Sequence, residues 1–209
     1  MNLAEALSEC PVMAILRGVH PDEIETVADA LVSSGIRAIE IPLNSPDALT
    51  SIDRLSRSGI GPAIVGAGTV LATRSVHECA DAGARFIVSP NTDRAVITTA
   101  QSNGMATVPG FLTPTEAFAA IEAGATMLKL FPAEAVKPEY VDSLRAVLPP
   151  GMMIVVTGGI SASSVSAWKG RHHIAFGVGG ALYRPGWNAI RVADSATGIV
   201  EAVSGFVGG

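Results

Sequence analysis

Short apolar runs alternate with longer amphipathic stretches along the whole chain. Each run has the length and apolar character of a parallel strand that is buried on both faces. The runs span residues 12–16, 38–41, 63–65, 86–88, 106–108, 127–130, 153–156 and 174–176. Between them lie helical patterns such as residues 22–34 and 114–122, the second with Thr113 as a candidate N-cap and Pro114 at the first helical position. Eight strand–helix units predict a single α/β domain over residues 1–209, a (β/α)8 TIM barrel. A doubly wound open sheet is the structural alternative.

A repeated motif places two charges inside the predicted barrel. In residues 34–40, 82–88 and 123–129, a glycine ends a helix and a strand follows at once. The fifth residue after the glycine is charged in two of the three segments, as Glu40 and Lys129. Alternate strands of a barrel contribute side chains to a common interior layer, so these two are expected to face each other from opposite walls. Because an unpaired buried charge is costly, a carboxylate facing an amine is the favoured arrangement.

Lysine usage singles out Lys129. The chain has three lysines, and Lys137 and Lys169 stand at a predicted helix start and in a helix-to-strand turn, where solvated charges are usual. Lys129 instead ends an apolar run. Apolar surroundings favour the neutral form of an amine, which is nucleophilic and suited to Schiff-base chemistry with a ketone. A structural ion pair with Glu40 is the alternative interpretation.

Two further charged positions stand where predicted strands end. Glu40 interrupts an apolar strand, where a carboxylate can exchange protons with a substrate hydroxyl near the amine. Arg17 closes the first apolar run, at the carboxyl end of a strand, where barrel active sites lie. Its guanidinium suits a substrate carboxylate or phosphate, and a salt bridge at the barrel rim is the alternative.

Glycine-rich turns follow the seventh and eighth predicted strands, at residues 157–161 and 177–180. In barrels, the loops after these strands, together with a helix amino terminus, commonly hold a phosphate through backbone N–H groups. The sequence therefore predicts a phosphate site that needs no cluster of lysines. Tight turns without a ligand are the alternative.

Composition excludes several classes of protein. Of the 209 residues, 48% are hydrophobic and 16% charged, which is an α/β composition and excludes disorder. The net charge of −5 argues against a nucleic-acid partner. The sequence shows no secretory signal pattern and no apolar stretch of about 18 residues, the length that a membrane-spanning helix needs. We therefore expect a cytoplasmic protein without membrane contact.

Metal and nucleophilic-triad chemistry find no motif in the chain. Cys10 and Cys79 follow no metal or redox spacing and are interpreted as buried apolar side chains. The four histidines do not have the spacing of a zinc site, and no Gly-x-Ser-x-Gly elbow occurs. We therefore expect chemistry without a metal or an organic cofactor.

Eight segments between residues 11 and 187 together carry a family pattern. They are AILRG at 14–18, EIPLNSP at 40–46, GAGTVL at 66–71, SPN at 89–91, VPG at 108–110, LKLFP at 128–132, TGG at 157–159 and LYRPG at 182–186. With these motifs the sequence resembles the bacterial 2-keto-3-deoxy-6-phosphosugar acid aldolases, the class I aldolases of the Entner–Doudoroff and related pathways. The resemblance implies a homotrimer of barrels that cleaves a small phosphorylated 2-keto-3-deoxy sugar acid.

The resemblance also implies roles for individual residues. Lys129 is expected to form the Schiff base and Glu40 to shuttle the proton. The substrate-binding residues that it implies are Arg17 and Thr69 at the pyruvyl end, Gly158, Gly159, Gly179 and Gly180 at the phosphate, and Pro90, Phe131 and Thr157. Gly180 departs from the family, which often has Ser in this turn, so one side-chain contact to phosphate is expected to be missing.

Two branches of the family differ in the C4 configuration of the substrate. The LRG, PLNSP and LYRPG segments resemble the galactonate branch, whereas Thr157 resembles the gluconate branch. We expect cleavage of 2-dehydro-3-deoxy-6-phospho-D-galactonate to pyruvate and D-glyceraldehyde 3-phosphate. The alternatives are the C4-epimeric gluconate substrate, with dual activity that includes 4-hydroxy-2-oxoglutarate, and a phosphosugar isomerase or epimerase that uses Glu40 as base. A non-catalytic sensor of such acids is a further alternative.

Overall fold

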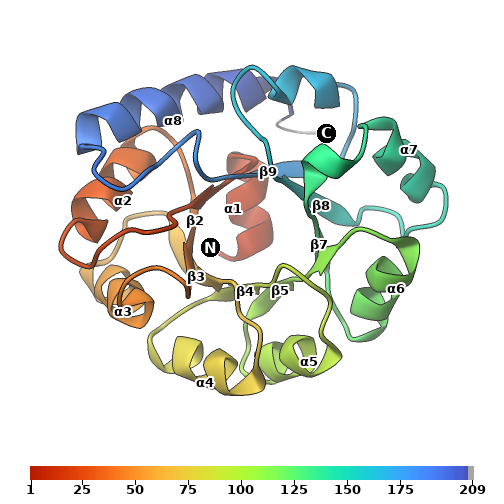
Figure 1. The fold of residues 1–209 in the computed structure, drawn as a ribbon, viewed down its shortest axis with the longest axis horizontal. Helices are drawn as coiled ribbons and strands as arrows, with labels where there is room; N and C mark the ends of the chain where they lie inside the picture. Colours follow the sequence, from red (N-terminus) through yellow and green to blue (C-terminus); the bar gives the residue numbers. More distant parts are fainter. Residues whose placement is uncertain (207–209) are drawn as a thin grey trace.

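The computed structural model describes residues 1–206 as a closed barrel of parallel strands surrounded by helices (Figure 1). The strands are β1 Val12–Ile15, β2 Ala38–Pro42, β3 Ile64–Gly68, β4 Phe86–Val88, β5 Ala106–Val108, β6 Gly110–Phe111, β7 Met127–Leu130, β8 Met153–Thr157 and β9 Ile174–Val178. Each of the eight apolar runs overlaps a strand, although β3 begins at Ile64 and extends three residues beyond the predicted run 63–65. The last three residues of the predicted domain, 207–209, lie outside the described residues.

The barrel closes through its fifth strand, which Pro109 divides into β5 and β6. β5 pairs with β4, and β6 pairs with β7, so the two short strands continue one another around the ring. Proline has no N–H to donate to a neighbouring strand. The Pro109 carbonyl still accepts a hydrogen bond from the Lys129 N–H at 2.8 Å. The closed ring confirms the (β/α)8 barrel and excludes the open doubly wound sheet.

Helices cover the outside of the ring. They are α2 Ile24–Ser33, α3 Ala48–Ser58, α4 Thr73–Asp81, α5 Arg94–Ser102, α6 Pro114–Glu122, α7 Glu139–Arg145 and α8 Ala189–Val203, with short 3-10 turns η1 Ala133–Ala135, η2 Val165–Trp168 and η3 Ser204–Phe206. α6 begins as predicted, because Thr113 and Glu116 form a reciprocal capping box with Pro114 in the first turn. α2 is shorter than expected, because the sequence pattern predicted a helix over residues 22–34. Every helix within residues 1–206 lacks the length or the apolar character that a bilayer crossing requires.

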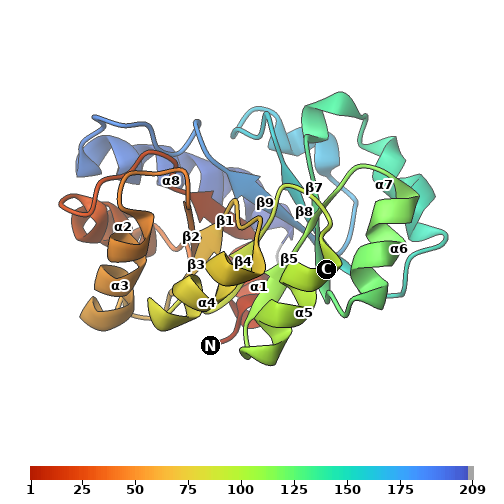
Figure 2. The same ribbon diagram turned by 60° about the horizontal axis from the view of Figure 1, so that its bottom comes forward.

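The amino-terminal end of the barrel is closed by α1, Leu3–Glu9, which lies below the strands in Figure 2. Leu3 and Leu7 of this helix pack into the cluster of inward-facing residues that includes Met13 and Phe86. This arrangement fills the barrel interior from one end. Within residues 1–206, the barrel interior is therefore open to a ligand from the carboxyl ends of the strands.

Candidate active site

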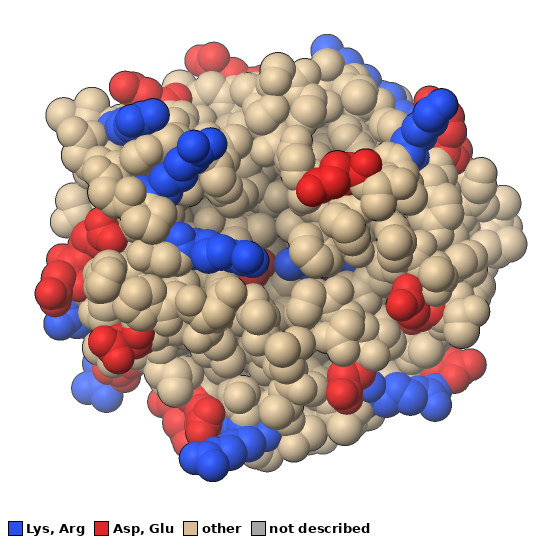
Figure 3. Space-filling model, in the orientation of Figure 1, with Lys and Arg blue, Asp and Glu red and all other residues tan. Residues whose placement is uncertain are grey.

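A cavity of about 760 Å³ opens at the carboxyl ends of the strands. Its walls come from the loops that follow β1, β7, β8 and β9, and Figure 3 shows basic and acidic side chains meeting in the hollow at the centre of this face. The predicted site residues that line it are Arg17, Phe131, Thr157, Gly158, Gly159, Gly179 and Gly180. The other four, Glu40, Thr69, Pro90 and Lys129, do not line this cavity.

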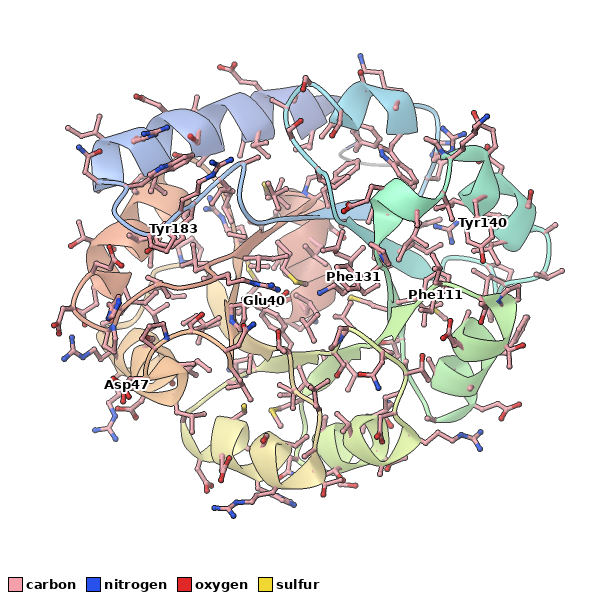
Figure 4. All side chains as sticks on the ribbon, viewed as in Figure 1. Glu40, Asp47, Phe111, Phe131, Tyr140 and Tyr183 are labelled. Carbon is pink, nitrogen blue, oxygen red and sulfur yellow. The ribbon has the colours of Figure 1, made fainter. Side chains whose placement is uncertain are left out.

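Glu40 and Lys129 lie deeper, inside the barrel. Glu40 is 1% exposed and Lys129 7%, and each stands two residues beyond an inward-facing residue of its strand, Ala38 or Met127. The Lys129 Nζ atom lies 5.2 Å from the centre of the Phe131 ring. Figure 4 shows Glu40 and Phe131 over the centre of the barrel. A buried amine, an aromatic ring and a carboxyl group therefore meet below the cavity.

The two buried charges do not form a close ion pair. Within residues 1–206, no carboxylate oxygen lies within 4.0 Å of Lys129 Nζ, and Lys129 Nζ donates no hydrogen bond. The Glu40 Oε2 atom likewise has no hydrogen-bond partner there. The alternative of a structural salt bridge between Glu40 and Lys129 is therefore not seen. Both groups retain unused hydrogen-bonding capacity, as groups that act on a substrate require.

Burial raises the pKa of Glu40 above the ordinary value of 4.5 for a glutamate. The positive charges of Lys129 and Arg17 act in the opposite direction and are the smaller effects. A raised pKa suits a group that takes up and returns a proton near neutral pH. Gly68 leaves the space for this carboxyl group, because a Cβ atom there would overlap Glu40 Oε1.

Thr69 has a strained backbone at the end of β3. Its φ angle is +56°, a left-handed conformation that is unusual for a β-branched residue. Hydrogen bonds on both sides hold it there: the Gly68 carbonyl accepts from Leu43 N–H at 2.8 Å, and the Val70 N–H donates to the Val88 carbonyl at 3.2 Å. Such strain costs about 1–3 kcal/mol and concentrates at functional sites.

Pro90 lies in the loop after β4 and is half-buried. Its carbonyl stands against Gly110, where a Cβ atom would overlap it. The hydroxyl of the preceding Ser89 donates to the Val70 carbonyl at 2.8 Å. Pro90 is thus fixed beside the segment that carries Thr69, across the barrel from the cavity's glycine-rich loops.

Thr157 ends β8 with a side chain that is 6% exposed and lines the cavity. It pairs with Gly177 of β9, where a Cβ atom would overlap the Thr157 hydroxyl. The hydroxyl oxygen lies 3.4 Å from the carbonyl of Val155, at the long limit of a hydrogen bond. It therefore stays available to a ligand.

The two glycine-rich turns present unused backbone donors. Gly158 and Gly159 have φ angles of +111° and +65°, which favour glycine. Within residues 1–206, the N–H groups of Gly158, Gly159, Gly180 and Ala181 donate no hydrogen bond, and all four residues line the cavity. Free N–H groups in adjacent turns suit an anion.

The predicted helix amino terminus is not part of this arrangement. The helical segment after β8 is the short 3-10 turn η2, and α8 begins only at Ala189. The Glu134 carboxylate of η1 instead lies against the Gly158–Gly159 turn, because a Cβ atom at Gly158 would overlap it. The backbone N–H donors at this site therefore come from the loops after β8 and β9.

Two residues that line the cavity, Tyr183 and Arg184, were not predicted as site residues. Tyr183 is 2% exposed, and its hydroxyl donates to Glu23 Oε1 at 2.8 Å, which joins the loop after β9 to the loop after β1. Burial and this carboxylate raise the pKa of Tyr183. Arg184 lies next to it and also lines the cavity. Both belong to the LYRPG segment, which indicated the family but did not indicate which residues these side chains contact.

Cavities of this kind at the carboxyl ends of barrel strands are where (β/α)8 enzymes bind small molecules, so fold and site together define a barrel enzyme. Within residues 1–206, no three His, Cys, Asp or Glu side chains are grouped as metal ligands would be. Comparison with known proteins narrows the class. The family model "KDPG and KHG aldolase" matches residues 3–196, and the chain belongs to this aldolase family.

Individual relatives agree with the family. A protein of Rhizobium meliloti (strain 1021), described as "Probable 2-dehydro-3-deoxy-6-phosphogalactonate aldolase", is 44% identical over 201 residues, covering 96% of this chain and 95% of the relative. The 2-dehydro-3-deoxy-6-phosphogalactonate aldolase of Escherichia coli (strain K12) is 40% identical, covering 93% and 95%. A solved structure described as "Native KDPGal structure" has a TM-score of 0.89 at 40% identity, covering 93% and 94%. Relatives described as 2-dehydro-3-deoxy-phosphogluconate aldolases are more distant, at 29%, 32% and 30% identity. The family resemblance predicted from the motifs is confirmed.

Proposed function

We propose that this protein is a Schiff-base aldolase that cleaves 2-dehydro-3-deoxy-6-phospho-D-galactonate to pyruvate and D-glyceraldehyde 3-phosphate. One observation carries the proposal: Lys129 is buried inside the barrel mouth, without a paired carboxylate within residues 1–206, and Glu40 faces the same interior. The identity of 40–44% to phosphogalactonate aldolases supports the substrate assignment.

The reaction begins when neutral Lys129 attacks the C2 ketone of the substrate. Loss of water gives a protonated imine, which withdraws electrons from the C3–C4 bond. Glu40 takes the proton from the C4 hydroxyl, directly or through one water, and the C3–C4 electron pair moves toward the imine. The C4 oxygen becomes the aldehyde of glyceraldehyde 3-phosphate, and the remaining enamine is protonated at C3 and hydrolysed to pyruvate, which regenerates the amine.

The other residues bind and orient the substrate. Arg17 lies close enough for its charge to act on Glu40, and its guanidinium suits the substrate carboxylate. Thr69 directly follows β3, the strand that pairs with β2, and β2 carries Glu40. The free N–H groups of Gly158, Gly159 and Gly180 suit the phosphate at the other end of the cavity. The chemistry needs no metal or organic cofactor.

The decisive measurement is pyruvate release from the two C4-epimeric 2-keto-3-deoxy-6-phosphoaldonates, compared as kcat/KM. We expect preference for the galactonate epimer. Preference for the gluconate epimer would show that the Thr157 hydroxyl selects the C4 configuration, because a buried polar contact discriminates strongly between epimers. Release from neither substrate would contradict the aldolase assignment.

Trapping identifies the nucleophile. Borohydride in the presence of pyruvate should attach the three-carbon unit to Lys129, and Lys129→Ala should abolish both trapping and turnover. Lys137→Ala is the matched control, because Lys137 is an exposed lysine near the start of α7. An active protein that leaves Lys129 unmodified would point to an isomerase or epimerase that uses Glu40 as base.

We also propose that the protein is cytoplasmic and assembles as a homotrimer of single-domain barrels. The resemblance to the aldolase family, which implies a homotrimer, supports this assembly. Light scattering coupled to size-exclusion chromatography checks the assembly, with a mass of three chains as the expected result. A monomer at micromolar concentration would contradict it.

A further inference from the structure

Arg184 is a cation at the cavity whose role the family motifs do not define. It lies between β9 and α8, and its exposed side chain lines the cavity together with Gly180. Its Nε donates a hydrogen bond to the Gly180 carbonyl at 2.8 Å. Its guanidinium carbon lies 5.8 Å from the centre of the Trp187 ring. A main-chain carbonyl and an aromatic face thus hold the guanidinium beside the glycine turn.

The Arg184 guanidinium forms no ion pair with any residue that the structure describes. Within residues 1–206, no carboxylate oxygen lies within 4.0 Å of Arg184 or of Arg17, the other arginine that lines the cavity. Among the described residues, the cavity lining contains no Asp or Glu; the carboxylates of Glu40, below the cavity, and of Glu134, against the Gly158–Gly159 turn, lie outside it. Arg184 and Arg17 therefore face the cavity without a carboxylate partner in its lining, which favours an anionic ligand there.

The Arg184 guanidinium lies beside the space that a side chain at position 180 would occupy. A Cβ atom at Gly180 would lie 3.9 Å from Arg184 Nε, so the space beside this glycine adjoins the guanidinium. Nε is engaged by the Gly180 carbonyl, and within residues 1–206 the two terminal nitrogens of Arg184 donate no hydrogen bond. Two parallel N–H donors match the oxygens of a phosphate.

We propose that Arg184 binds the phosphate of the substrate and thereby sets the preference of this site for phosphorylated over unphosphorylated sugar acids. It supplies the side-chain contact that Gly180 lacks. This inference rests on the proposed function, because it concerns the distal end of the same substrate. A purely structural role, in which Arg184 only supports Trp187, is the competing explanation.

The kinetic test compares 2-dehydro-3-deoxy-6-phosphogalactonate with its unphosphorylated counterpart. In Arg184→Met, kcat/KM for the phosphorylated substrate should fall about tenfold to a hundredfold, mainly through KM, while the unphosphorylated substrate changes less than about twofold. Arg184→Lys should recover part of the loss. Arg191→Met is the matched control, because Arg191 lies 4.0 Å from the centre of the same Trp187 ring but does not line the cavity. An equal loss on both substrates, or no loss on either, would overturn the proposal.

A second measurement is independent of turnover. Glycerol 3-phosphate carries the phosphate end of the substrate, and its binding can be titrated calorimetrically to wild type, Arg184→Met and Arg191→Met. We expect binding to weaken about tenfold in Arg184→Met alone. Absence of binding to wild type, or equal binding by Arg184→Met, would contradict the role of Arg184. Retained Arg184-dependent binding by a protein that cleaves neither epimer would instead contradict the aldolase assignment.

Discussion

Glycines on the inner face of the barrel decide where the polar side chains of the site lie. Gly68 leaves room for the carboxyl group of Glu40, and Gly177 leaves room for the hydroxyl of Thr157. In both cases the glycine belongs to the strand next to the polar residue. Because barrel interiors are closely packed, a side chain in place of either glycine would compete with these groups for space.

Gly68→Ala tests this dependence. The added methyl group must displace the Glu40 carboxyl group, so kcat should fall about tenfold or more, and the free energy of unfolding should fall by about 1–3 kcal/mol. Steady-state kinetics and urea unfolding measure the two effects. Gly198→Ala, in α8 with open space around it, is the control and should leave kcat unchanged. Unchanged kcat in Gly68→Ala would show that Glu40 is not positioned by this contact.

Glu40→Gln separates stability from activity. Burial raises the pKa of Glu40, so the folded state disfavours the ionised carboxylate. The stability that the protonated carboxyl group contributes is fully present below pH 4.5 and is lost as the pH rises through the folded-state pKa. Glu40→Gln should therefore unfold at a higher temperature than wild type at pH 8, with the difference shrinking toward pH 4, while kcat falls at least about a hundredfold. Thermal unfolding across this pH range and pyruvate release provide the readouts. A pH-independent difference would contradict burial as the cause.

The sequence identifies Lys129, Glu40 and Arg17 because a charge within or at the end of an apolar run is visible in one dimension. Gly68, Gly177 and Arg184 are different. Their importance depends on which side chain or carbonyl faces them from a neighbouring strand or turn, and spacing along the chain does not encode that. The strain at Thr69 is a property of backbone geometry and has no sequence signature in a threonine.

At the scale of elements, the alternation of apolar and amphipathic segments was sufficient to predict all eight barrel strands. The exception is β6, Gly110–Phe111, which is too short for a periodic pattern and follows a proline that normally ends a strand. It forms because the Gly110 and Phe111 positions pair with Lys129 and Leu130 of β7. The tertiary pairing of the ring therefore overrides the local signal.

The start of α6 is an element whose stability has a local cause. Thr113→Ala removes the hydroxyl that accepts from the Glu116 N–H, and should lower the free energy of unfolding by about 1 kcal/mol. Thr115→Ala is the matched control two residues further on, because this exposed threonine is inside the helix and forms no side-chain hydrogen bond within residues 1–206. Urea unfolding of both variants provides the measurement. Equal effects would contradict the capping role of Thr113.

At the scale of the whole molecule, the two ends of the barrel have separate tasks. α1 closes the amino-terminal end with fully buried apolar side chains, whereas the charged and glycine-rich residues gather at the carboxyl end. A substitution that destabilises the packing of α1 is therefore expected to leave catalysis at the carboxyl end unchanged.

Leu7→Ala tests the separation. Loss of this 1%-exposed side chain should lower the free energy of unfolding by about 2–5 kcal/mol, while kcat/KM of the folded protein stays within about twofold of wild type. Val147→Ala, at a position that is 59% exposed, should change neither the free energy of unfolding nor kcat/KM. Chemical unfolding and pyruvate release at 25 °C distinguish the outcomes. A matching loss of kcat/KM in Leu7→Ala would show that the two ends are coupled.

In the described part of the chain, α1 blocks access to the barrel interior from the amino-terminal end, and this constrains the order in which ligands bind and leave. Lys129 lies at depth, and the proposed phosphate donors lie nearer the surface. The aldehyde fragment then leaves first, since it stands between the enamine and the solvent, and pyruvate leaves last. In the direction of synthesis the order is reversed: pyruvate enters first and the aldehyde second, so that an aldehyde which arrives early obstructs the route to the amine through the cavity.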